Sequence, residues 1–262
     1  MNKLIISFCV FLLAVGCDTN VKKTIKTNER LTMSTIFVQH APEYKALCYQ
    51  AYNLASVRLK EAVEANASQK KLAVVLDIDE TVLNNIPYQA KQVSDDMSYP
   101  KCWMEWCELA EAEPVPGVAS FLHEADSLGV AIFYISNRKT NVLGSTINNL
   151  KKVGLPQADS SHVMLRVSAS EKETRRQKVL AEGYEIVLLF GDNLSDFSAD
   201  YEIADNLIRN KTATEQAALF GSRFIVLPNP GYGTWTQNLG LNSSSISQDS
   251  LEKTLMHGFD CQ

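Results

Sequence analysis

The sequence predicts an α/β fold in which helices cover both faces of a parallel sheet. Three observations support this prediction. Short apolar runs recur along the chain, stretches with helical spacing separate them, and polar side chains follow most of the runs. Because parallel strands need long crossover connections, such alternation is typical of a parallel sheet. The five predicted strands are residues 71–76, 130–135, 162–166, 185–190 and 224–227.

The first predicted helix, residues 43–66, is rich in Ala, Leu, Lys and Glu, and its apolar residues recur at steps of three and four. The strand at 71–76 contains β-branched residues, as expected for a strand buried on both faces. Residues 83–115 then form a polar, aromatic-rich insertion that ends at prolines. The remaining predicted helices precede the later strands and cover residues 117–129, 141–154, 172–183 and 213–221.

A single domain is expected for residues 35–262, because a chain of 262 residues with 45% hydrophobic residues can bury one sizeable core. We assign residues 70–82 and 116–240 to the sheet core. The helix within 35–66 and the insertion 83–115 are expected to form a smaller, mainly helical cap.

The N-terminus has the composition of an export signal. Residues 1–16 carry one lysine, then an apolar run, then small residues. The stretch "LAVGC" resembles the bacterial lipoprotein box, which implies a membrane lipid anchor on Cys17; a plain signal peptide with an incidental cysteine is the alternative. Residues 17–34 are then expected to be a flexible tether. The protein is expected on the outer membrane or the periplasmic face of a bacterial membrane.

Charge and cysteine content argue against several classes of protein. The net charge of −5 does not favour binding to a nucleic acid polymer. No stretch after the signal is long and apolar enough to span a bilayer. The remaining cysteines suggest no disulfide framework, and the scattered histidines argue against zinc. These cysteines are Cys48, Cys102, Cys107 and Cys261.

Polar side chains that can carry chemistry follow four of the predicted strands. "LDIDET" places Asp77 and Asp79 after the first strand, and "ISNR" places Ser136 and Asn137 after the second. Ligands bind beyond the carboxyl ends of the strands in open α/β sheets, so one site is expected at this edge. The candidates after the next two strands are Lys172, and Asp192 and Asp196 of "GDNLSDF".

These residue types fit the hydrolysis of a phosphate ester. An Asp carboxylate such as Asp77 can attack phosphorus and form an aspartyl-phosphate. Mg²⁺ prefers oxygen ligands, and Asp77 and Asp192 could supply them. Lys172 would add a fixed positive charge, and Ser136 could donate a hydrogen bond to the phosphate. Asp79 follows Asp77 by two residues, so in an extended backbone it points to the same side and could exchange a proton with the leaving oxygen.

The order and spacing of these motifs resemble the haloacid dehalogenase superfamily, in its phosphohydrolase branch. "DIDETVLNN", "FYISNR", "KETRRQKV", "GYEIVLLFGDNLSDF" and "LPNPGYGTW" together resemble the class C acid phosphatases, which are bacterial lipoproteins. The resemblance covers roughly residues 35–240. It implies a haloacid dehalogenase-like (Rossmann-like) sheet with a cap, and a metal-dependent phosphomonoesterase.

The resemblance also implies a role for each motif residue. Asp77 is expected to be the nucleophile and a Mg²⁺ ligand. Asp79 is expected to be the general acid and base, with its backbone carbonyl on the metal. Asp192 is expected to be a further metal ligand. Asp196 is expected to orient water bound to the metal without being a direct ligand. Lys172 is the preferred motif lysine.

Some of these residues have structural alternatives. Ser136 and Asp196 could each cap a helix. Lys172 could be a solvated surface lysine, in which case Lys178 on the same predicted helix is the rival for the motif lysine. The spacing before the double arginine favours Lys172.

Aromatic residues suggest the substrate. Trp103 in "KCWMEWCELA" and Tyr232 in "NPGYGTW" match positions that clamp the base of the substrate in the resembling family, although aromatics at helical spacing are more often packing residues. Asn137 is also expected to contact substrate. We therefore expect an acid phosphatase for 5′-nucleotides, with a homodimer as a further expectation. The alternative is a lipoprotein that mainly binds a ligand such as haem, or mediates adhesion, on a phosphatase scaffold.

Overall fold

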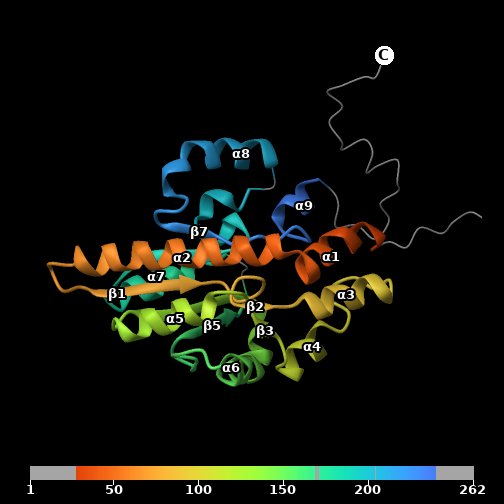
Figure 1. The fold of residues 1–262 in the computed structure, drawn as a ribbon, viewed down its shortest axis with the longest axis horizontal. Helices are drawn as coiled ribbons and strands as arrows, with labels where there is room; N and C mark the ends of the chain where they lie inside the picture. The colour runs from red at the N-terminus through yellow and green to blue at the C-terminus, as the bar shows by residue number, and fades with distance from the viewer. Residues whose placement is uncertain (1–27, 169–170, 204, 240–262) are drawn as a thin grey trace, which may run out of the picture.

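A computed structural model describes residues 28–168, 171–203 and 205–239. Within them a parallel five-stranded sheet has the order β5-β4-β1-β6-β7, which confirms the predicted fold class (Figure 1). The strands begin and end within a few residues of the predicted bounds, except that β4 continues past the predicted end at residue 135 to Lys139. They are β1 Lys71–Leu76, β4 Ala131–Lys139, β5 Val163–Arg166, β6 Tyr184–Gly191 and β7 Phe224–Val226.

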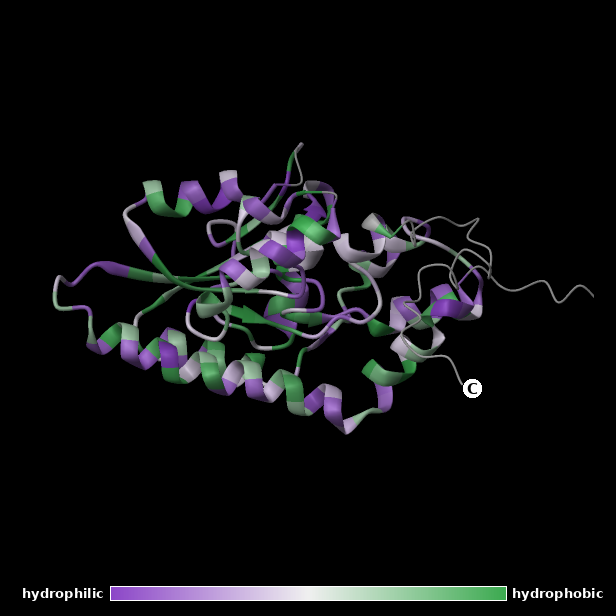
Figure 2. Ribbon diagram, turned by 90° about the horizontal axis from the view of Figure 1, so that it is seen from above, coloured by the Kyte–Doolittle hydropathy of each residue, from purple (hydrophilic) through white to green (hydrophobic). Residues whose placement is uncertain are grey.

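Both faces of the sheet are buried. Successive side chains of a strand point to opposite faces, so each strand contributes to both core clusters. In central strand β1, Leu72, Val74 and Leu76 join one core cluster, while Ala73 and Val75 join the other. The first cluster includes Cys107 of α4 (Trp103–Leu109) and residues of three longer helices, and the second includes Val179 of α7 (Glu173–Ala181). Figure 2 shows these hydrophobic strands between helices that carry hydrophilic residues. The three helices are α2 Pro42–Glu64, α5 Val118–Ser127 and α6 Leu143–Lys152.

Helix α2 belongs to the core layer, which corrects its assignment to a cap. It runs along the length of the molecule (Figure 1), and its buried face packs against α5, β6 and β7. The residues of that face recur at helical spacing, so that the apolar stripe faces the sheet. They are Tyr44, Cys48, Tyr52, Ala55 and Leu59.

The insertion leaves and re-enters the core through a short antiparallel pair, β2 (Leu83–Asn84) with β3 (Glu113–Pro114). Between them lie α3 (Ile86–Ser94) and α4 (Trp103–Leu109). Helix α1 (Thr32–His40) packs against α3 at the same end of the molecule (Figure 1). The smaller helical part is therefore built from α1 and the insertion.

Residues 28–34 were predicted to belong to a flexible tether, and this is wrong. They form η1 (Glu29–Leu31) and the first turn of α1. Asn28 is buried, and its side-chain amide donates to the carbonyl oxygens of Met97 at 2.6 Å and Gln92 at 3.3 Å. These bonds fix the segment against α3. The predicted signal, Cys17 and the start of the tether lie outside the described residues, as does Cys261.

The helix predicted at 213–221 begins earlier, as α8 (Asn206–Glu215), and ends in η5 (Ala217–Leu219). The remaining short helices are η2 Thr140–Val142, η3 Leu194–Asp196, η4 Ala199–Tyr201 and α9 Thr234–Asn238.

No helix in the described ranges has the length and apolar character that a membrane span requires.

Candidate active site

A cavity of about 670 Å³ lies at the carboxyl ends of the strands, within the size range of small-molecule sites. Most of the residues singled out from the sequence line it. Ser136 is the exception, since it is fully buried beside the cavity wall. The predicted residues in the lining are Asp77, Asp79, Trp103, Asn137, Lys172, Asp192, Asp196 and Tyr232.

Three carboxylates meet at the floor of this cavity. Asp77 follows β1, Asp192 follows β6, and Asp196 lies in η3; one oxygen of each is within 4.8 Å of the others. The N–H of Asp77 donates to the carbonyl of Phe190 at 3.0 Å, which continues the ladder between the two strands beyond β1. The parallel register thus places two of the three carboxylates side by side.

The carboxylate of Asp196 caps a short helix and also belongs to the carboxylate cluster. Its carboxylate accepts from the N–H of Asn193 at 3.1 Å and so caps η3, as the structural alternative proposed. It also lies nearer to the cluster than expected, since it is one of the three grouped carboxylates. Gly191 makes this approach possible, because a Cβ at that position would lie 2.4 Å from Asp196.

Lys172 is buried and forms ion pairs with Asp77 and with Asp196, the latter at 2.7 Å. It stands at the N-terminal cap of α7, whereas its rival Lys178 is exposed on the same helix. Burial alone would lower the pKa of Lys172, but the carboxylates of Asp196 and Asp77 outweigh that effect and raise it. Lys172 is therefore a charged partner of the carboxylate cluster and not a surface lysine.

The cluster remains short of positive charge. Three carboxylates against one ammonium leave two negative charges if all are ionised. Burial, followed by repulsion from Asp196, raises the pKa of Asp192 to about 7, and burial also raises the pKa of Asp77 well above its ordinary value despite Lys172. The donors are all oxygens, the ligands of hard divalent cations. The residues present therefore fit a divalent metal ion, which Asp77, Asp192 and Asp196 would hold.

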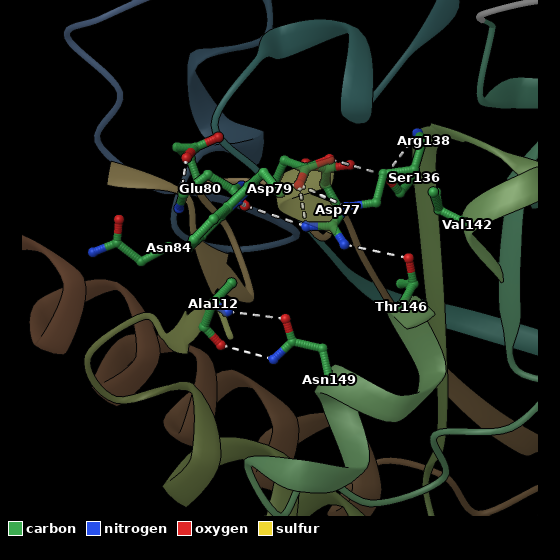
Figure 3. A network of polar contacts seen from close by, with 12 residues as sticks. Asp77, Asp79, Glu80, Asn84, Ala112, Ser136, Arg138, Val142, Thr146 and Asn149 are labelled. Carbon is green, nitrogen blue, oxygen red and sulfur yellow. Dashed lines mark hydrogen bonds and ion pairs between the residues drawn. The ribbon is translucent and has the colours of Figure 1, made fainter. Parts of the chain in front are cut away.

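Asp79 has different partners from Asp77. Its Oδ1 pairs with Arg138 Nη2 at 2.8 Å and accepts from Asn85 Nδ2 at 2.9 Å, and its Oδ2 accepts from Ser136 Oγ at 3.2 Å. Figure 3 shows Asp79, Ser136 and Arg138 pointing toward one another. The Asp79 side chain keeps 18% of its surface exposed, whereas that of Arg138 keeps 1%. Ser136 is thus bonded to Asp79, a contact that the sequence analysis did not anticipate.

Arg175 is a site residue that the sequence analysis missed. Its guanidinium donates to the carbonyl of Ser136 at 2.5 Å and to Oδ1 of Asn137 at 2.6 Å, so it fixes the end of β4. Its neighbour Arg176 pairs with Glu173 at 2.7 Å and donates to the carbonyl of Asp196 at the same distance. The double arginine after Lys172 was the available signal, but sequence spacing does not show that both side chains turn inward.

Glu80 is a second missed residue. It is buried with φ +58°, and it accepts hydrogen bonds from the N–H of Asn85 at 3.0 Å, from Gln89 Nε2 at 3.2 Å and from the hydroxyl of Tyr232. Burial, and then repulsion from Asp79, raises the pKa of Glu80 well above its ordinary value. All three of these partners are neutral, whereas the carboxylates around Lys172 have a charged partner.

Aromatic rings form part of the cavity wall. The ring of Trp103 lies 5.0 Å from that of Tyr88 and 6.0 Å from that of Tyr99, centroid to centroid, and 5.6 Å from the guanidinium of Arg138. Tyr232 is 40% exposed, with its hydroxyl on Glu80. Trp106 is not in the lining; its indole N–H donates to Asn85 at 2.8 Å. Of the two insertion tryptophans, only Trp103 lines the cavity.

The comparisons with known proteins agree with this geometry. Residues 13–235 match the family described as HAD superfamily, subfamily IIIB (acid phosphatase). The structure is similar to that of the class C acid phosphatase from Bacillus anthracis, with TM-score 0.83 and 42% identity, covering 90% of this chain and 100% of that chain.

Curated plant proteins are more distant. The chain is 30% identical over 133 residues to the stem 31 kDa glycoprotein of Glycine max, covering 48% of this chain and 52% of that protein. It is 29% identical over 134 residues to acid phosphatase 1 of Solanum lycopersicum, covering 47% and 50%. The chain thus spans about half the length of the curated relatives it matches. The family match over most of the chain nevertheless shows that it belongs to the subfamily IIIB acid phosphatases of the haloacid dehalogenase superfamily.

Proposed function

We propose that this protein is a metal-dependent acid phosphatase that hydrolyses 5′-nucleotides through an aspartyl-phosphate on Asp77. One observation carries the proposal. A single cavity combines the carboxylates around Lys172 with the aromatic rings of Trp103 and Tyr232. With a divalent cation bound, the first group would suit a phosphate, and the second suits a planar base.

The proposed reaction has two steps. In the first, an oxygen of Asp77 attacks phosphorus, the bond from phosphorus to the ester oxygen breaks, and Asp79 gives that oxygen a proton. In the second, Asp79 takes a proton from water, the water oxygen attacks phosphorus, and the bond to Asp77 breaks to release phosphate. Lys172 balances the charge that develops beside Asp77.

Mg²⁺ is the proposed cofactor, held by Asp77, Asp192 and Asp196, with the backbone carbonyl of Asp79 as a further proposed ligand. When bound, it would offset the repulsion between the carboxylates and an anionic substrate. The all-oxygen donor set and the raised pKa of Asp192 support this choice.

The substrate assignment rests on the cavity wall. Asn137 and Tyr232 both line it, and Trp103 presents an aromatic ring from the insertion. Aromatic faces accept many bases, so we propose broad use of nucleoside 5′-monophosphates.

The test is phosphate release from a nucleoside 5′-monophosphate by protein that has been stripped with EDTA, before and after addition of Mg²⁺. We expect no turnover after stripping and full recovery with Mg²⁺. Full activity in the stripped protein would contradict the metal requirement. Tight binding of a planar ligand such as haem with no turnover of any phosphate ester would favour the alternative of a binding lipoprotein.

We further propose that the protein is an exported lipoprotein anchored through Cys17, on the strength of the "LAVGC" stretch. Metabolic labelling with a radioactive fatty acid should label the wild-type protein and not the Cys17→Ala variant. Equal labelling of both would contradict the anchor.

A further inference from the structure

We propose that Arg138 is a positioning residue that serves both halves of the cavity: it holds the carboxylate of Asp79 toward the leaving group and supports the ring of Trp103 against the substrate. This inference rests on the proposed function. It concerns a residue that lies two positions after Ser136 and that is not in the cluster around Lys172.

The contacts of Arg138 reach four separate segments. Its guanidinium pairs with Asp79 in the loop after β1, with distances to Oδ1 of 2.8 Å from Nη2 and 2.9 Å from Nε. Nη1 donates to Thr146 of α6 at 3.2 Å, and Nη2 donates to Asn85, just after β2, at 3.3 Å. Its fourth contact is with Trp103 of α4, across 5.6 Å to the ring. Figure 3 shows the guanidinium between Asp79 and Thr146.

The fork of an arginine suits this arrangement. Nε and Nη2 both reach one carboxylate, while Nη1 is bonded to a different helix, so the guanidinium plane is fixed on two sides. A fixed plane fixes the carboxylate in turn. A lysine at this position would keep the charge but lose the fork and most of the stacking on Trp103.

The other partners of Asp79 do not replace the pair of contacts by which Arg138 orients the carboxylate. Asn85 also donates to Asp79, but its own oxygen is taken by the indole of Trp106 and by Arg138. The Ser136 hydroxyl reaches the second oxygen at 3.2 Å. Without the arginine, one amide and one hydroxyl would remain to orient a carboxylate that must face the leaving oxygen.

Three substrates separate the two roles. p-Nitrophenyl phosphate has a leaving group that departs without a proton, so the first step with this substrate does not need Asp79 as an acid. The second step needs Asp79 as the base for every ester, so the first step is measured alone, as leaving-group release in a single turnover at saturating substrate. Glycerol phosphate needs a proton on its leaving oxygen and has no ring. A nucleoside 5′-monophosphate needs the proton and carries a ring.

We expect Arg138→Lys to lower this single-turnover rate on glycerol phosphate by about tenfold to a hundredfold, a part of the 10²–10⁴-fold that general acid catalysis supplies. On p-nitrophenyl phosphate the single-turnover rate should change by less than about threefold. The nucleotide should show the same loss in this rate and, in addition, a higher KM, because the ring of Trp103 loses its support. In the double variant Asp79→Asn/Arg138→Lys, the loss on glycerol phosphate should not exceed that of Asp79→Asn alone.

Asn149→Ala is the matched control. Asn149 is buried on α6 close to Thr146 in sequence, and its amide makes two hydrogen bonds with the backbone of Ala112, at 2.8 Å and 3.0 Å, away from Asp79 (Figure 3). This variant should lower the melting temperature and leave the ratio between the three substrates unchanged.

An equal loss of the single-turnover rate on all three substrates in Arg138→Lys, as in Asn149→Ala, would show that the arginine has only a structural role. If Arg138→Lys does not fold, Thr146→Val removes one anchor of the guanidinium without touching Asp79. It should shift the ratio in the same direction by a smaller factor, and an unchanged ratio would overturn the inference. Wild-type activity on the three esters tests the proposed function separately: an active wild type with unchanged ratios in the variants defeats this inference alone.

Discussion

The floor and the wall of the cavity are held by different forces. At the floor, Asp77 and Asp196 are buried and joined by the charge of Lys172; Asp77 directly follows β1, and Asp196 lies in η3, shortly after β6. At the wall, Trp103 contacts neighbouring rings and Tyr232 is 40% exposed, held through its hydroxyl. The floor is thus fixed by the topology of the sheet, and the wall by contacts between loops and the insertion.

The same contrast appears within one loop, between Asp77 and Glu80. Both carboxyls are buried and have pKa values raised by burial. Asp77 is paired with the ammonium of Lys172, while Glu80 accepts hydrogen bonds from neutral donors, one of them Tyr232. A charged partner suits a carboxylate that must ionise and react, and neutral donors suit one that holds a wall residue in place.

The largest expected effect lies at the floor. Asp77→Asn should lower kcat by more than about a thousandfold on every phosphate ester, because an amide cannot act as the nucleophile. The fold should persist, since Lys172 keeps its pair with Asp196 and the cluster loses one negative charge. Phosphate release and circular dichroism of the purified variant check both points. Near-normal turnover would contradict the nucleophile assignment.

The next effect concerns metal and pH. The pKa of Asp192 is raised to about 7 in the folded protein, so in metal-free protein its contribution to stability is fully present below its unfolded pKa and is lost as the pH rises through about 7. Adding Mg²⁺ at pH 7 should raise the melting temperature, because the ion binds only the folded state.

Asp192→Asn supplies the control for this effect. It should weaken the pH dependence of the metal-free melting temperature between about pH 4 and pH 7, and it should also reduce the stabilisation by Mg²⁺. A variant that responds to pH and to Mg²⁺ like the wild type would show that Asp192 is not part of the metal site.

A smaller effect is expected at the wall. Trp103→Ala and Tyr232→Ala should each raise the KM for a nucleoside 5′-monophosphate by about tenfold to a hundredfold, because stacking on one aromatic is worth about 1–3 kcal/mol. Glycerol phosphate should be almost unaffected, since it has no ring. An equal loss on both substrates would mean that the aromatics are packing residues, and the distinction between floor and wall would fail.

The smallest effect separates the ring of Tyr232 from its hydroxyl. Tyr232→Phe keeps the ring and removes the hydrogen bond to Glu80, so the free energy of unfolding should fall by about 1 kcal/mol. The nucleotide KM should rise by only a few-fold. A rise as large as that of Tyr232→Ala would show that orientation by Glu80, and not stacking, provides the affinity.

The floor was largely predictable from the sequence because Asp77 and Asp192 follow predicted parallel strands, and the carboxyl ends of such strands meet at one edge. The site role of Arg138 was not predictable. It lies in β4 like its exposed neighbours, and only the fold shows that its side chain turns inward to Asp79. Residues of the wall depend on tertiary contacts between distant segments, as the anchoring of Asn28 against α3 illustrates. Helix α2 was misassigned because its apolar stripe does not show whether it faces a cap or the sheet.

The most direct test of the account is to trap the covalent intermediate. Asp79→Asn should still be phosphorylated but should lose the group that activates water, so the aspartyl-phosphate should accumulate after mixing with p-nitrophenyl phosphate and acid quenching. Mass spectrometry of the digested protein should then find one phosphoryl group on the peptide that contains Asp77, and none in the Asp77→Asn/Asp79→Asn double variant. A phosphoryl group on another residue such as Ser136, or equal labelling of the double variant, would contradict Asp77 as the nucleophile.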